Sequence, residues 1–240
     1  YGALGWSLAF LFAGFICSAA AWRQLLAAHG FPMGWKPALA SVGLTVFGKY
    51  IPGKVWSLVG RAGYVARLTG YSLGPLSALS VTAQLLMIWL GLGLGSLMFL
   101  TAPGLGRAEA GVLLLSVCGL LTIAAVLLSD FPRRLLDWLS ACWRGRLPQL
   151  PHQDWRSLLA ALPLFLLTWI CWMLGFSLFV TALTNGGITI GHGLAFALAA
   201  TLGILAVLVP GGLGVREGLL VLFLGAFGIP PTTATGVALH

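Results

Sequence analysis

The sequence predicts an all-α protein, a polytopic membrane helix bundle with about five full spans and two re-entrant or broken helices. Hydrophobic residues make up 59% of the 240 residues and charged residues only 8%, whereas about a quarter of an ordinary soluble domain is charged. The 13 basic and 5 acidic side chains are too few to cover the surface of a soluble protein of this length. Most of the surface is therefore expected to face lipid.

Five stretches reach the length of about 20 apolar residues that a spanning helix needs. They are Gly2 to Trp22, Ser72 to Thr101, Ala110 to Ser129, Ser157 to Thr184, and Ile188 to Val209. The second is longer than a span requires, so we expect it to tilt or to begin at the interface with Gly74 and Pro75. Its glycines from Gly91 to Gly95 are expected to let a neighbouring helix pack closely.

Two shorter apolar stretches, Pro37 to Phe47 and Gly218 to Ile229, have about half the required length and are bordered by Gly and Pro. They are predicted to be re-entrant. Basic side chains indicate the orientation, because Lys and Arg are retained on the cytoplasmic side. Six fall between Arg23 and Arg67 and five in the connection 130–156, which is also expected to contain a short interfacial helix. Both connections are therefore expected in the cytoplasm, which requires the first short helix to enter and return on the same side.

Residues 1–240 are interpreted as one transmembrane domain that is truncated at both ends. Tryptophans near the predicted span ends are interpreted as anchors in the headgroup layer; they are Trp22, Trp35, Trp56, Trp138, Trp143 and Trp155. The cysteines lack the spacing of a metal site or a redox motif and are interpreted as packing residues; they are Cys17, Cys118, Cys142 and Cys171.

The first segment that could carry function reads GKYIPGKVW, from Gly48 to Trp56. Pro52 and Gly53 are expected to break the preceding helix. Such a break at membrane depth is tolerated only inside protein or beside a watery cavity. Lys54 and Arg61 would make that cavity cationic, and its natural ligand is an anion such as phosphate. The alternative is a juxtamembrane basic helix that rests on anionic lipids.

The second segment reads PGGLGVREG and opens a short apolar helix, with Arg216 and Glu217 expected in its first turns. Its breakers are Pro210, Gly211, Gly212 and Gly214. Arg216 and Glu217 are adjacent, so they are expected to point in different directions and to need separate partners, and Glu217 could meet Lys54 or Arg61. The alternative for Glu217 is a charge that merely caps the helix dipole. Two broken helices far apart in sequence are typical of transporters that bind their substrate near the midplane.

At GKYIPGKVW with Arg61, and again at PGGLGVREG, the chain resembles the lysylphosphatidylglycerol synthase transmembrane region, a family also described as flippase-like. The resemblance covers most of the chain. It implies a multi-pass protein of a bacterial or archaeal inner (plasma) membrane that moves an anionic lipid or lipid-linked envelope precursor between leaflets. It also implies that the basic residues and the broken helices line the headgroup path; the residues that carry over are Lys49, Lys54, Arg61, Arg216 and Glu217. Full synthases add a soluble aminoacyl-transfer domain, which residues 1–240 do not contain, so no synthase activity is assigned to them.

The sequence shows no catalytic constellation, no metal-spaced cluster and no Walker-type loop, so no metal or cofactor is expected and movement would be passive or ion-coupled. Because the basic residues fall between apolar stretches, the expected partner is an anionic lipid in the membrane and not nucleic acid. Two alternatives stay open. A membrane-embedded transferase would use Glu217 or the loop from Asp130 to Asp154 as acid or base. A non-transporting scaffold would recruit envelope-biosynthesis proteins through the loop from Arg133 to Arg156.

Overall fold

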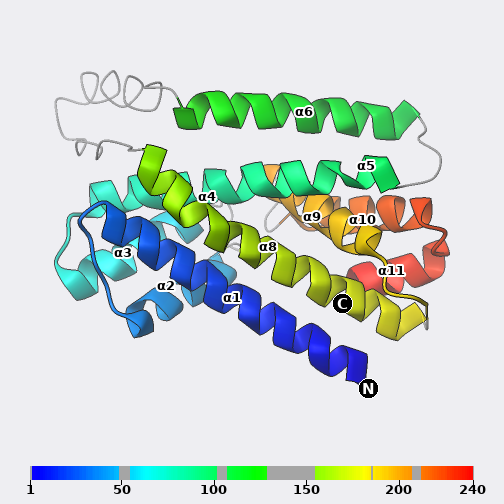
Figure 1. The fold of residues 1–240 in the computed structure, drawn as a ribbon, viewed down its shortest axis with the longest axis horizontal. Coiled ribbons are helices and arrows are strands. Elements are labelled where there is room, and N and C mark those ends of the chain that lie inside the picture. The colour runs from blue at the N-terminus through cyan, green and yellow to red at the C-terminus, as the bar shows by residue number, and fades with distance from the viewer. Residues whose placement is uncertain are drawn as a thin grey trace.

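The computed structural model describes residues 2–48, 55–101, 107–128, 155–184, 186–206 and 212–239. Within these ranges the chain forms helices joined by short turns and contains no strand, which confirms the predicted all-α class. The long helices lie side by side along the long axis of the molecule (Figure 1). This is the architecture of a membrane helix bundle.

The helices follow the predicted apolar stretches in order. Their bounds are α1 Gly2–Ala28, α2 Trp35–Gly48, α3 Val55–Thr69, α4 Leu73–Ser96, α5 Met98–Thr101, α6 Arg107–Leu128, α8 Trp155–Thr184, α9 Ile190–Leu205, α10 Val215–Ala226 and α11 Pro231–Leu239. Within the described ranges, three stretches are long and apolar enough to cross a membrane: Gly2–Ala28, Leu73–Thr101 and Arg156–Thr184. Two shorter apolar stretches, Ala110–Val126 and Ile190–Leu205, lie in the other two predicted spans.

The longest predicted span is divided in two. α4 ends at Ser96, and Leu97 separates it from α5 by a tighter turn in which its N–H bonds Leu94 O at 3.1 Å. Pro75 lies in the first turn of α4, where its missing N–H removes no helical hydrogen bond. The excess length of this apolar stretch is therefore taken up by a short additional helix.

The core is arranged around α4, which packs against α3, α6, α8 and α9, while α1 packs along α8. Gly95 allows the close approach of α4 and α9, because a Cβ at this position would lie 2.6 Å from Leu198 N. A Cβ at Gly91 would likewise meet the side chains of Thr201 and Trp169. These contacts confirm the interpretation of the glycine run as a close-packing surface.

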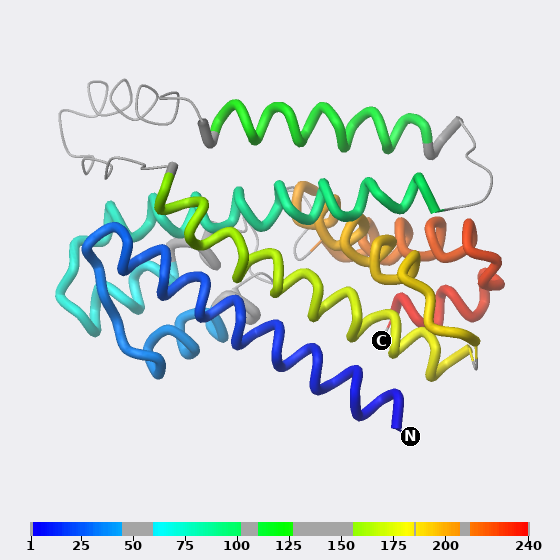
Figure 2. The backbone as a smooth tube through the Cα atoms, in the orientation of Figure 1, coloured from blue at the N-terminus to red at the C-terminus, as the bar shows by residue number. Residues whose placement is uncertain are grey.

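The helix directions place the flanks of the two basic connections at one end of the molecule. At the left of Figure 2, α1 ends, α4 begins, α6 ends and α8 begins. The helices α2 and α3 pack against each other there and return the chain to the end at which it left α1. This is the arrangement that the charge count requires if the first short helix is re-entrant.

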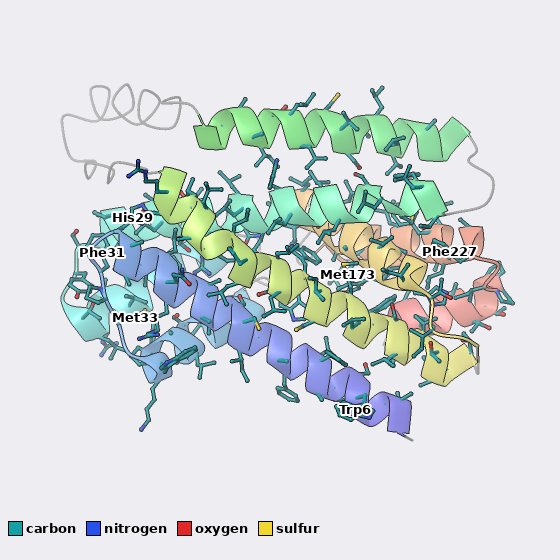
Figure 3. All side chains as sticks on the ribbon, in the orientation of Figure 1. Trp6, His29, Phe31, Met33, Met173 and Phe227 are labelled. Atoms are coloured by element: carbon teal, nitrogen blue, oxygen red, sulfur yellow. The ribbon has the colours of Figure 1, made fainter. Side chains whose placement is uncertain are left out.

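The turn between α1 and α2 is fixed to its neighbours at this end. Figure 3 labels His29, Phe31 and Met33 there. Phe31 packs edge-on against Tyr71 with 5.2 Å between ring centroids, and Arg23 Nε donates to Met33 O at 3.0 Å. These contacts hold the start of α2 against the end of α1.

The isolated histidine and cysteine side chains of the apolar helices differ in their burial. His192 of α9 is buried and packs edge-on against Phe227 of α10, at the opposite end of the bundle (Figure 3). Cys171 is buried, as a packing residue should be, but Cys118 is exposed. The packing interpretation is wrong for Cys118 because it lies on an outer face of α6, whose described contacts are with α4. The interfacial helix expected within 130–156 lies outside the described residues.

Candidate functional site

Arg61 is a charged side chain buried inside the bundle. It lies on α3 with only 7% of its surface exposed. Its Nε donates to Ser80 Oγ of α4 at 3.0 Å, and its Nη2 donates to Ser80 Oγ at 2.8 Å and to Ser80 O at 3.0 Å. Because arginine stays protonated in proteins, this is a buried cation held by neutral oxygens.

The flat face of the Arg61 guanidinium is covered by Trp22 of α1. The guanidinium carbon lies 4.1 Å from the ring centroid, and Trp22 is fully buried. A desolvated cation–π contact of this kind contributes about 2 kcal/mol. The interpretation of Trp22 as a headgroup anchor is therefore wrong: α2 and α3 cover the end of α1 and bring this ring into the interior.

Arg61 is not neutralised by any carboxylate whose position the structure describes. Among those side chains the one carboxylate is that of Glu217, which pairs with Arg216. Burying an unpaired ion costs several kcal/mol even after the surroundings relax. Hydrogen bonds and ring contact reduce that cost but leave a net positive charge at the junction of α1, α3 and α4.

The other predicted residues of the first segment cannot be compared with the structure. Lys49, Lys54, Pro52 and Gly53 lie outside the described residues. The bounds of α2 and α3, which end at Gly48 and begin at Val55, lie on either side of the predicted break.

The second segment is described from Gly212 onward, so Pro210 and Gly211 fall outside it. Gly212 and Gly214 have φ angles of 71° and 80°, which L side chains rarely adopt. A Cβ at Gly212 would also lie 2.8 Å from Gly203 C, at the end of α9. These two glycines therefore permit the tight reversal from α9 into α10, as a helix-breaking segment should.

Glu217 stabilises the start of α10, which begins at Val215 and so includes Arg216 and Glu217 in its first turn, as predicted. Its Oε2 accepts the N–H of Gly214, the N-cap residue, at 2.7 Å. Its Oε1 lies 2.9 Å from Arg216 Nη2. The capping alternative is therefore supported, since a carboxylate in the first turn also favours the helix dipole.

The expectation that Arg216 and Glu217 need separate partners is wrong. Glu217 turns back towards the N-cap, and the long side chain of Arg216 reaches the same point from the neighbouring position. Arg61, in contrast, contacts Ser80 and Trp22, so among the described residues it is not brought to Glu217. α3 and α10 both lie beside the central helices, α3 against α4 and α10 against α9.

Two of the residues around Arg61 were missed as site residues at the level of sequence. Ser80 had a signal, because a serine within an apolar stretch tends to bond another helix. The position of Trp22 near the end of a span was misleading, because it indicated an anchor in the headgroup layer. Elsewhere in the described part of the chain, no group of three or more His, Cys, Asp or Glu side chains is placed to hold a metal ion.

Comparison with known proteins supports the resemblance found at the two motifs. No curated protein and no solved structure gave a match. A family model described as the lysylphosphatidylglycerol synthase TM region matches residues 2–240. The chain therefore belongs to the lysylphosphatidylglycerol synthase transmembrane-region family, whose members are membrane proteins.

Proposed function

We propose that this protein binds the anionic headgroup of a lipid, or of a lipid-linked envelope precursor, at Arg61 and moves it between the two leaflets. The observation that carries the proposal is the buried guanidinium, which is held by neutral groups among the described residues. Ionisable groups at membrane depth are expensive and mark substrate or ion pathways. The planar fork of arginine also matches a phosphate better than the point charge of lysine does.

The position of Arg61 suits a headgroup that enters from the end carrying the basic connections. Arg61 lies on α3, which belongs with α2 to the hairpin at that end (Figure 1). We assign that end to the cytoplasm, because basic connections are retained there. Movement would then be passive or ion-coupled, with Arg61 as the first fixed cation that a headgroup meets inside the bundle.

Lipid scrambling in proteoliposomes tests this function. Fluorescent phosphatidylglycerol would be followed as it becomes accessible to an external quencher, for the wild type and for Arg61→Ala. Arg67→Ala is the matched control, because it removes the same charge from the same helix at an exposed position. We expect Arg61→Ala to lose movement and Arg67→Ala to retain it. Equal rates for the wild type and Arg61→Ala, or no rate above that of protein-free vesicles, would contradict the proposal.

A further inference from the structure

Trp22, whose ring contacts Arg61, carries a hydrogen-bond donor that has no acceptor among the described residues. Its side chain is fully buried, and its Nε1 has no hydrogen-bond partner among the described residues. A buried indole N–H usually finds an acceptor, as Trp169 Nε1 does with Met87 O at 2.9 Å. A buried donor without an acceptor destabilises a fold. We therefore ask which ligand group could accept this hydrogen bond.

An unpaired indole N–H is not by itself a site. Trp172 Nε1 is also unpaired, but its ring packs on Gly14 of α1, and among the described residues no cation lies over it. Trp22 differs because the Arg61 guanidinium lies over its ring, with 4.1 Å between the guanidinium carbon and the ring centroid. A cation from α3 and an unpaired donor on α1 therefore belong to two side chains that are in contact.

Among the described residues, the two side chains in contact here are a cation and a donor without an acceptor. Arginine and the indole nitrogen both donate hydrogen bonds and cannot accept them. Their complement is a group that only accepts and carries negative charge, which describes a phosphate oxyanion. An ammonium group has three donors and no acceptor, so it would be repelled by the guanidinium and would leave the indole N–H unpaired.

We propose that Trp22 Nε1 and Arg61 together form one oxyanion subsite that takes the phosphodiester of a lipid headgroup, and not its amine. This rests on the proposed function and specifies the chemistry that the site recognises. Entry of the ligand requires α3 to move away from α1. α3 packs mainly against α2 and α4. Its described contact with α1 is that of the Arg61 side chain with the Trp22 ring. Separation of these two helices therefore exchanges the ring contact for bonds to the phosphate.

A pair of matched variants separates this role from packing. Trp22→Phe keeps an aromatic face for Arg61 but removes the N–H together with part of the indole ring. Trp172→Phe makes the same change of ring at a second unpaired indole, which has no cation over it among the described residues. Binding of dioctanoyl phosphatidylglycerol to the purified protein would be measured for both, with dioctanoylglycerol, which lacks the phosphodiester, as the negative ligand.

We expect Trp22→Phe to weaken binding of phosphatidylglycerol about tenfold or more, the usual effect of losing a hydrogen bond to a charged group. Without ligand, its thermal stability should fall by no more than that of Trp172→Phe, because both variants lose the same ring atoms and an unpaired donor. Trp172→Phe should bind as the wild type does. A Trp22→Phe variant that is markedly less stable than Trp172→Phe, and that loses binding with its stability, would indicate a purely structural Trp22 and would overturn the inference.

The remaining outcomes distinguish the inference from the function beneath it. If Arg61→Ala abolishes binding and Trp22→Phe binds as the wild type does, the indole has no role while the proposed function stands. If Arg61→Ala binds normally, both fail. Inorganic phosphate is the last probe: tighter binding of the lipid assigns the oxyanion to a headgroup, whereas equal binding assigns the subsite to free phosphate and overturns the headgroup part of the proposal.

Discussion

Replacing Ser80 by alanine removes the oxygen that receives two of the three hydrogen bonds described for Arg61. The bonds lost are those from Nε at 3.0 Å and from Nη2 at 2.8 Å, both to Oγ. The bond from Nη2 to the carbonyl oxygen at position 80 remains, because alanine keeps the backbone. The variant therefore leaves a buried cation with fewer acceptors.

The expected cost is about 2 kcal/mol. A hydrogen bond to a charged group contributes about 1.5–3 kcal/mol, and the two lost bonds share one acceptor, so their values do not add in full. Replacing the cation as well should reverse the effect. Arg61→Met with Ser80→Ala places apolar groups of similar size at a buried site, which is often neutral or stabilising. The double variant is thus expected to be more stable than Ser80→Ala alone.

Reversible unfolding in mixed micelles, followed by tryptophan fluorescence, would measure these free energies in a double-mutant cycle. Ser116→Ala is the control, because Ser116 is equally buried but bonds only Val112 O of its own helix in the contacts described, at 2.8 Å. We expect this control to change stability by less than about 0.5 kcal/mol. A cost for Ser80→Ala no greater than that of the control, or a double variant less stable than Ser80→Ala, would refute the reasoning.

Two further predictions concern the breaks and the helix packing. Glu217→Ala removes the acceptor at Gly214 and is expected to lower the free energy of unfolding by about 1 kcal/mol, with Glu217→Gln intermediate because it keeps an acceptor oxygen; a Glu217→Gln variant as stable as the wild type would contradict a charge contribution. Gly95→Ala places a Cβ 2.6 Å from Leu198 N and should cost about 1–3 kcal/mol in the same unfolding assay, whereas Gly111→Ala, with nothing within 4 Å, should be neutral. Similar values for the two glycine variants would show that α4 and α9 are not held by that close approach.

The helices of this protein were predictable because their signal is local. A run of about 20 apolar residues needs no knowledge of its neighbours to indicate a span, since lipid requires every backbone group to be bonded within the helix. The breaks were predictable for the same reason: Gly212 and Gly214 adopt positive φ angles that few other residues tolerate. The apolar stretch there begins only at Gly218, but the glycines before it place Arg216 and Glu217 in the first turn of the helix, as the start of α10 at Val215 confirms.

The site was less predictable because its chemistry depends on which faces of the helices meet. The rule that places tryptophan in the headgroup layer assumes that the end of a span is exposed, yet the hairpin of α2 and α3 covers the end of α1. α1 is apolar around its whole circumference, so no pattern in it shows which face turns inward. Once Trp22 is inside, its ring supports Arg61 and its N–H loses access to water. The cation was visible in the sequence, whereas the unpaired indole N–H follows only from the packing that buries Trp22.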